Sequence, residues 1–163
     1  MDRPRAQEHP DPLGGPERDK TVIRQATHED GNALALLFGS AIGGHQDPHA
    51  LLNAIASPGN IVLVITGKTD LTGGIRGHLA GAEAEIHDVA VHPDHRRQGH
   101  GRRLVEAFLS MARARGVEQV FLEVRVSNRA AYEMYTTAGF VTVGDRPAYY
   151  TDGEAAAVLR CSC

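Results

Sequence analysis

The sequence predicts an α/β (α+β) fold, a single domain with a β-sheet of about six or seven strands flanked by about four helices. Three observations carry this prediction. The 163 residues are 42% apolar and 23% charged, with a formal net charge of −3, which is typical of one soluble globular domain rather than two. Apolar residues recur with a period of two in some segments and with helical spacing in others. Glycines, prolines and capping residues separate these segments.

The first half of the domain is predicted to pair two short helices with three strands. Thr27, with Asp30 three residues later, resembles a helix-capping arrangement, and Asp47 followed by Pro48 supplies a cap and an N1 proline. Glycines are expected to weaken the last strand of this half. The expected elements are a strand at 21–26, a helix from Thr27 to about Ala41, a loop at 43–46, a helix at 50–56, a strand at 61–65, a turn at 68–70 and a strand at 71–80.

The second half alternates strands with longer helices. Leu104, Phe108 and Ala112 recur every four residues and define one apolar helix face, which ends at Gly116. Asn128 is a helix cap. The expected elements are a strand at 84–92, a helix at 101–115, a strand at 120–126, a helix from Asn128 to about Ala138 and strands at 140–143 and 155–161.

The ends of the chain differ from this pattern. Residues 1–20 hold five acidic and four basic residues and four of the eight prolines, without hydrophobic periodicity, so we expect a disordered tail before a domain at 21–163. No apolar run exceeds six residues, which argues against a membrane span or a secretory signal. Cys161 and Cys163 are too close together for a framework disulfide and too few for a zinc site, so a cytoplasmic location is expected.

Arginines gather at one point of the chain. Fifteen of the 17 basic residues are arginine, and four of them lie within residues 96–103. The segment 96–101 runs Arg-Arg-Gln-Gly-His-Gly between a strand and a helix, where backbone amides and the positive helix end favour a diphosphate. A surface turn with solvated arginines is the alternative explanation. The near-neutral total charge argues against direct nucleic-acid binding, and the segment lacks the residues of a Walker loop or a dinucleotide fingerprint.

Arg96, Gly99 and Gly101 match the Arg/Gln-x-x-Gly-x-Gly/Ala signature of the GNAT superfamily of N-acetyltransferases, which residues 21–160 resemble. The stretches "VAVHPDHRRQGHGRRLVE", "LEVRVSNRAAYEMYTTAGF" and "RPAYY" are most similar to the bacterial ribosomal-protein alanine N-acetyltransferases, the RimI type. The resemblance implies a mixed sheet whose central parallel strands splay apart to admit pantetheine. It also implies transfer of an acetyl group from acetyl-CoA to an amine, without a metal.

The resemblance assigns roles to residues of this chain. Glu123 matches the proposed general base, and Tyr135 matches the proposed general acid, which also contacts the cofactor. Tyr149 and Tyr150 occupy a position that resembles the substrate-side hairpin, where they would line an acceptor channel or pack beneath it. The residues implied to hold the cofactor are Val89, Ala90, Val91, Arg96, Arg97, Gln98, Gly99, His100, Gly101, Arg102 and Asn128.

The chemistry is compatible with these residue types, but the residues alone leave alternatives open. Glu123 could simply pair with Arg125 or Arg129 at the surface, and Tyr135 could be a core aromatic. Glu85 is a second candidate base, since histone-acetylating relatives place a glutamate at the corresponding position. The sequence spacing of four histidines gives no repeating ligand geometry, so no metal is expected. These histidines are His87, His92, His95 and His100.

Three functions remain open at this point. The first is acetylation of a protein N-terminus, as in the alanine-specific relatives. The second is acetylation of a small amine such as an aminoglycoside or a polyamine, and the third is a non-catalytic acetyl-CoA-binding module. The segment "GGHQDPHALL" lacks the tryptophan-containing aromatic stretch usual in RimI-type proteins, which leaves the acceptor unidentified. The oligomeric state is not indicated by the sequence.

Overall fold

The computed structural model describes residues 21–43, 46–68 and 70–163. The expected tail at 1–20 lies outside this part of the chain, as do residues of the expected loop at 43–46 and turn at 68–70. The type and order of the predicted strands and helices are confirmed, with two 3-10 turns added. The elements are β1 (Val22–Gln25), η1 (His28–Asp30), α1 (Gly31–Ile42), α2 (Pro48–Ala56), β2 (Asn60–Thr66), β3 (Leu71–Ala80), β4 (Glu83–Val91), η2 (Pro93–His95), α3 (His100–Ala114), β5 (Gln119–Arg125), α4 (Arg129–Thr137), β6 (Val141–Arg146) and β7 (Ala156–Ser162).

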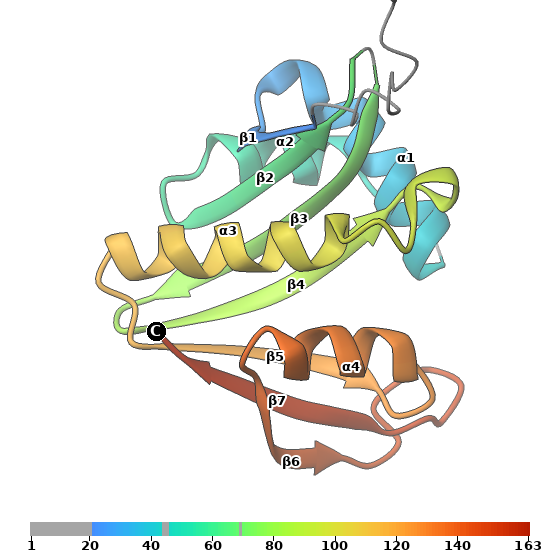
Figure 1. The fold of residues 1–163 in the computed structure, drawn as a ribbon, viewed down its shortest axis with the longest axis vertical. Coiled ribbons are helices and arrows are strands. Elements are labelled where there is room, and N and C mark those ends of the chain that lie inside the picture. Colours follow the sequence, from blue (N-terminus) through green and yellow to red (C-terminus); the bar gives the residue numbers. More distant parts are fainter. Residues whose placement is uncertain (1–20, 44–45, 69) are drawn as a thin grey trace, which may run out of the picture.

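The strands form one seven-stranded sheet in the order β1-β2-β3-β4-β5-β7-β6 (Figure 1). Neighbouring strands run antiparallel except β4 and β5, which are parallel and stand at the centre. The connection between these two strands contains α3, as a parallel pair requires a crossover. The predicted mixed sheet flanked by four helices is therefore confirmed.

The two central strands pair only where they begin. Glu83, Ala84 and Glu85 of β4 face Gln119, Val120 and Phe121 of β5, and pairing stops there. β4 continues to Val91 and β5 to Arg125. Figure 1 shows the two strands diverging beyond their paired ends. The expected splay is present, and it leaves main-chain groups of both strands outside the sheet ladder.

A β-bulge in β4 lies at the point where the splay begins. Gly77 of β3 faces Ile86 and Arg76 faces Asp88, so His87 has no partner across this ladder. Because a bulged residue breaks the alternation of side chains, the two sides of the bulge send their apolar residues to opposite faces. Ile86 packs in the core beneath α3, whereas Ala90 packs in the core beneath α1.

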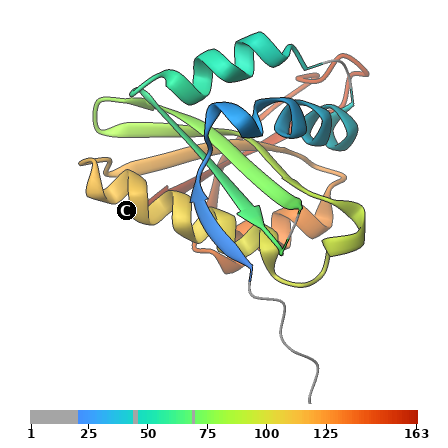
Figure 2. The same cartoon turned by 90° about the horizontal axis from the view of Figure 1, so that it is seen from above.

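Helices cover the sheet from both sides (Figure 2). On one side α3 and α4 bury the larger core, which contains Phe108, Phe140 and Leu159. On the other side α1 and α2 pack against β2, β3 and β4 and bury a smaller core around Phe38. The sheet therefore has apolar faces on both sides near its centre, which explains the continuous apolar run of β2.

The glycines of β3 allow close packing of the helices. A Cβ at Gly77 would overlap the main-chain oxygen of Glu85 and come within 2.6 Å of the Phe108 ring. A Cβ at Gly74 would overlap Leu34 of α1. These glycines were expected to weaken the strand, and β3 spans ten residues with a bulge at Thr72 in its ladder with β2. Their missing side chains leave room for the helices on both faces.

Boundaries differ from the predictions where the pattern is irregular. The strand expected at 140–143 continues to Arg146 as β6. Thr142 and Gly144 face consecutive residues of β7, so Val143 bulges between them and breaks the alternation that sequence analysis used. Both cysteines are free thiols. Within the part of the chain that the structure describes, no helix is long and apolar enough to cross a bilayer.

Asp30 joins β1 to the start of α1. Its carboxylate accepts hydrogen bonds from the Thr27 amide at 2.7 Å and from the Thr27 hydroxyl at 3.2 Å. It also receives both terminal nitrogens of Arg24, at 2.7 and 2.9 Å. The bond from Arg24, assisted by those from Thr27, lowers the pKa of Asp30, although burial opposes the shift.

Replacing Asp30 by asparagine is expected to lower the free energy of unfolding at pH 7 by about 1 to 3 kcal/mol, because a partly buried charged acceptor is lost. Since the folded-state pKa is depressed, the contribution of Asp30 is present above its unfolded value and is lost as the pH falls through the folded value. The difference between wild type and D30N should therefore shrink below about pH 4. Urea unfolding at pH 7 and pH 3 measures it, with D145N on exposed β6 as the control.

Candidate active site

The splay exposes the segment of β4 that was expected to hold the cofactor. Val89, Ala90 and Val91 lie beyond the last residue of β4 that pairs with β5. On its other side β4 still pairs with β3 as far as Val91. The main-chain groups of Val89–Val91 that face β5 thus make no ladder pairs with β5, whereas pairing with β3 holds this part of β4 in place.

The loop between β4 and α3 has an unusual backbone. Arg97 and Gly99 both have positive φ angles, of 59° and 80°, and Gly99 is the N-cap of α3. Arg97 is one of two non-glycine residues with positive φ in the described chain. Such turns, followed directly by a helix N-terminus, present main-chain amides to an anion. The Nε of Arg96 donates to the Val91 carbonyl at 3.1 Å and ties this loop to the end of β4.

The side chains of the same loop are not all available to a ligand. Arg102 pairs with Glu106 at 2.7 Å on the surface of α3. His100 is 6% exposed, and its Nδ1 lies 3.4 Å from the Thr72 hydroxyl. A Cβ at Gly101 would lie 2.8 Å from the sulfur of Met134, so this glycine lets α4 approach α3. His100 and Gly101 can therefore contribute backbone rather than side-chain atoms.

The side chains of Gln98 and Asn128 form hydrogen bonds with nearby main-chain groups. The Gln98 amide nitrogen donates to the Asp94 carbonyl at 3.4 Å. Asn128 is the N-cap of α4, and its Oδ1 accepts from the Ala131 amide at 3.2 Å. Asn128 follows the end of β5, so the start of α4 is fixed close to the open end of the splay.

Glu123 lies on β5, and its carboxylate contacts side chains from β6 and from the loop between β6 and β7. Its side chain is 14% exposed, and its Oε1 lies 2.8 Å from the Nε of Arg146. The Tyr149 hydroxyl donates to its Oε2 at 3.4 Å. The surface partner is Arg146 rather than Arg125, because Arg125 is bound to Asp152 and Glu154. Arg146 was not among the predicted site residues, because it comes near Glu123 only through the order of strands in the sheet.

Tyr135 lies on the core face of α4 and is 8% exposed. Its ring meets Phe140 edge to face, with centroids 5.8 Å apart. Burial raises the pKa of Tyr135 well above its ordinary value, and the nearby Tyr150 and Asp88 raise it further. Tyr135, Asp88 and Tyr150 belong to α4, β4 and the loop after β6, so these three segments lie near one another. The hydroxyl is therefore a neutral donor at physiological pH.

The loop at 147–155 carries the two tyrosines and is anchored to the end of β5. The Arg125 guanidinium binds Asp152 at 2.9 Å and Glu154 at 2.8 Å, and it lies 3.8 Å from the centroid of the Tyr150 ring. Hydrogen bonds from Ser127, assisted by Arg125, lower the pKa of Glu154 to about 2. Tyr150 is half-buried beneath this cluster, whereas Tyr149 is 47% exposed and turned toward Glu123.

The other carboxylates near the splay have different surroundings. Glu85 has a half-exposed side chain, 3.7 Å from the His87 ring. Asp88 is 8% exposed and accepts from the Nε of Arg76. The charge of Glu123, with a smaller effect of Glu85, raises the pKa of Tyr149, so both glutamates act on the same hydroxyl.

Among the described residues, no group of three or more histidine, cysteine, aspartate or glutamate side chains is arranged to hold a metal ion. Three of the four candidate histidines instead form a row beside the loop. The His95 ring stacks on His100 and meets His92 edge to face, with 6.0 Å between centroids in both pairs.

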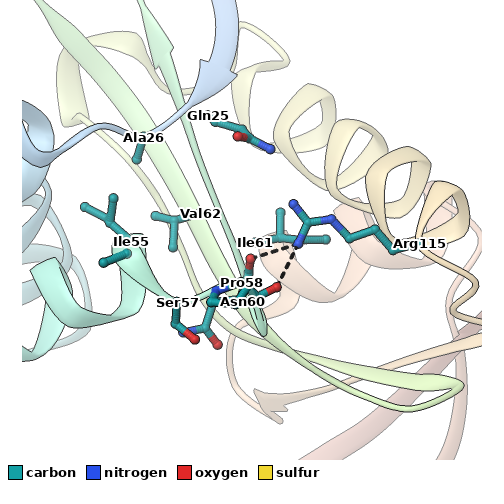
Figure 3. A pocket seen from close by; sticks show the side chains of 10 residues that line it. Gln25, Ala26, Ile55, Ser57, Pro58, Asn60, Ile61, Val62 and Arg115 are labelled. Carbon is teal, nitrogen blue, oxygen red and sulfur yellow. Dashed lines mark hydrogen bonds between the residues drawn. The ribbon is translucent and has the colours of Figure 1, made fainter.

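A separate polar cavity of about 180 Å³ lies where α2, β2 and the end of α3 meet (Figure 3). It shares no residue with the splay or the loop. Arg115 stands at its edge and donates to the main-chain carbonyls of Pro58 and Asn60, both at 3.2 Å. These bonds join the α2–β2 connection to α3. The cavity is thus spatially separate from the chemistry-bearing residues.

Comparisons with known proteins agree with this geometry. Residues 29–140 match the model of the acetyltransferase (GNAT) family. The chain is 39% identical over 138 residues to the N-alpha-acetyltransferase RimI of Mycobacterium tuberculosis, which covers 81% of this chain and 85% of that protein. It is 43% identical over 79 residues to the [ribosomal protein bS18]-alanine N-acetyltransferase of Escherichia coli, covering 47% of this chain and 53% of that protein. This alignment thus spans about half the length of the relative.

Solved structures give the same result for the fold. The crystal structure of the ribosomal-protein-S18-alanine N-acetyltransferase from Escherichia coli superposes with a TM-score of 0.79 at 28% identity, over 87% of this chain and 93% of that one. Ard1 from Thermoplasma volcanium gives the same TM-score and identity over 87% and 97%. The family match covers more than half of the chain, and the mycobacterial relative is matched over most of both lengths. This chain belongs to the acetyltransferase (GNAT) family.

Proposed function

We propose that the protein is an acetyl-CoA-dependent N-acetyltransferase whose acceptor is the N-terminal α-amine of a protein or peptide. The observation that carries the proposal is the arrangement of Glu123 and Tyr135 around a splayed β4–β5 pair that ends in an amide-rich loop. The mycobacterial relative named as an N-alpha-acetyltransferase supports the choice of acceptor. The ribosomal-protein alanine enzymes among the relatives support a protein N-terminus in particular.

The residues present fit the cofactor. The unpaired edge of β4 at Val89 and Val91 suits an extended arm carrying amides, since strand edges hydrogen-bond such groups. The left-handed residues Arg97 and Gly99 and the start of α3 suit a diphosphate. Arg96 and Gln98 belong to the same loop, and Arg102 lies in the first turn of α3. When bound, acetyl-CoA supplies an acetyl group activated as a thioester.

Glu123 and Tyr135 divide the proton transfers. Glu123 accepts a proton from the acceptor ammonium, directly or through a water, so that the nitrogen can form a bond to the acetyl carbon. Tyr135 donates its hydroxyl proton to the sulfur as the carbon–sulfur bond breaks, and the second proton of the attacking nitrogen returns to the Tyr135 oxygen, which leaves an amide, a free thiol and a neutral tyrosine. No covalent enzyme intermediate is needed. An α-amine ionises near pH 7.7 to 8.0 and a lysine near 10.4, so deprotonating lysine at pH 7 costs about 3 kcal/mol more. A carboxylate base therefore suits an α-amine.

The acceptor class is tested by measuring thiol release with acetyl-CoA and a peptide that begins with alanine. The same peptide with a blocked N-terminus and a panel of aminoglycosides and polyamines serve as comparisons. We expect release with the free peptide only, with mass spectrometry placing the acetyl group on the α-amine. Release with a small amine instead would make the protein a small-molecule acetyltransferase. Cofactor binding without release to any acceptor would make it a binding module.

The cofactor site is tested with two matched glycine variants. Gly99 and Gly116 flank α3, both have positive φ, and a Cβ at either would meet no atom within 4 Å. Each alanine variant therefore strains the backbone similarly, by about 1 kcal/mol. We expect G99A to weaken coenzyme A binding about fivefold in calorimetry and G116A to leave it unchanged, because only Gly99 shapes the loop. Equal affinities of the two variants for coenzyme A would show that the diphosphate does not bind at residues 96–101.

A further inference from the structure

Arg146 reaches Glu123 across an intervening strand. Arg146 ends β6 and Glu123 lies on β5, with β7 between them. In the ladders Arg146 faces Ala156, whereas Glu123 faces Val158, so the guanidinium passes diagonally over β7. Ala156 carries only a methyl group and is fully buried. This small residue leaves room for the arginine to reach Oε1 of Glu123 at 2.8 Å.

A second group from the same segment holds the other carboxylate oxygen. Tyr149 follows Arg146 by three residues and donates to Oε2 of Glu123 at 3.4 Å. The Arg146 guanidinium lies 5.8 Å from the Tyr149 ring centroid, so the two groups support each other. A carboxylate offers about four acceptor positions. Tyr149 uses one of them, and Arg146 lies against the other oxygen as an ion pair, which leaves positions for an acceptor amine or a water.

Arg125 lies on the same strand as Glu123 but does not hold the Glu123 carboxylate. Its guanidinium is committed to Asp152 and Glu154 and lies over the Tyr150 ring. The chain thus uses one arginine to anchor the loop and a different one to hold the carboxylate. Arg146 itself is 57% exposed, so its ion pair contributes little to folding. A role in orienting Glu123 accounts better for a contact that spans a strand.

We propose that Arg146, assisted by Tyr149, is a positioning residue that fixes the orientation of the Glu123 carboxylate and so sets the rate of amine deprotonation. This inference rests on the proposed function, in which Glu123 is the base. Losing the guanidinium frees the carboxylate to rotate, and a misdirected base slows proton transfer without altering cofactor binding.

The inference is tested by steady-state kinetics on R146Q, R146K and R113Q with acetyl-CoA and the alanine peptide. We expect R146Q to lower kcat roughly tenfold with the KM for acetyl-CoA within about twofold. R146K should recover most of the loss because it restores a cationic donor. R113Q removes the same charge from an exposed position of α3 and should keep wild-type kcat. Unfolding temperatures of R146Q and R113Q should be similar.

A double-mutant cycle with E123Q separates positioning from a general structural effect. If Arg146 acts through Glu123, adding R146Q to E123Q should change kcat less than about twofold. The inference is overturned by a wild-type kcat in R146Q, or by an equal fall in both backgrounds. Failure of the proposed function gives a different result, namely no acetyl transfer by the wild type or full activity in E123Q.

Discussion

Tyr135→Phe is expected to lower kcat roughly 100-fold and to leave coenzyme A affinity within about twofold. The substitution removes a single oxygen from a ring that is 8% exposed and packs edge to face on Phe140, so the fold should be preserved. In the proposed mechanism, the hydroxyl that is lost is the donor that protonates the leaving sulfur. Stopped-time thiol release gives kcat, and calorimetry gives the affinity.

The pH dependence adds a second test of Tyr135. Its raised pKa keeps the hydroxyl protonated throughout an assay range of about pH 6 to 9. Ionisation of Tyr135 should therefore produce no basic limb in the wild-type profile of kcat. Because the folded-state pKa lies above the unfolded value, the linked stability is present below about pH 10 and is lost above it.

Tyr132→Phe is the matched control for this experiment. Tyr132 lies on the same helix, is 38% exposed and bonds Thr142 of β6 at 2.9 Å. It faces away from the splay, so Y132F should retain wild-type kcat. Equal losses in Y132F and Y135F would indicate a structural effect of α4. Wild-type kcat in Y135F would remove Tyr135 from the acid role.

The fold was predictable because strong local signals mark most of its elements. The four-residue spacing of Leu104, Phe108 and Ala112 predicts α3, and all three side chains are fully buried. Gly116, which has a positive φ, follows the end of this helix. Signals failed where the backbone departs from regular geometry. The bulges at His87 and Val143 shift the side-chain alternation, and a bulge has no composition of its own to reveal it.

The sequence offers candidate site residues but not the groups that contact them. Glu123 and Tyr135 followed from motifs, whereas Arg146 meets Glu123 because β7 is inserted between β5 and β6. Asp88 and Arg76 pair across β3 and β4 only because the bulge places them opposite each other. Such contacts depend on register and on strand order, neither of which is encoded in short segments of sequence.

Glu123→Gln should lower kcat/KM for the peptide by roughly 10² to 10³. The amide keeps the shape of the side chain, but it loses the charge that pairs with Arg146 and cannot take up a proton. The geometry favours Glu123 over Glu85 as the base. Glu123 has a side chain that is 14% exposed and held at both oxygens, whereas the Glu85 side chain is half exposed.

Glu85→Gln is therefore the decisive comparison. It is expected to lower kcat/KM less than about threefold, because a solvated carboxylate beside His87 acts on the site only through its charge. Values of kcat/KM for the peptide assign the base. If kcat/KM falls roughly 100-fold or more in E123Q and less than about threefold in E85Q, the proton passes to Glu123. The reverse pattern would assign the base to β4, and Arg146 would then position a carboxylate with no part in the reaction.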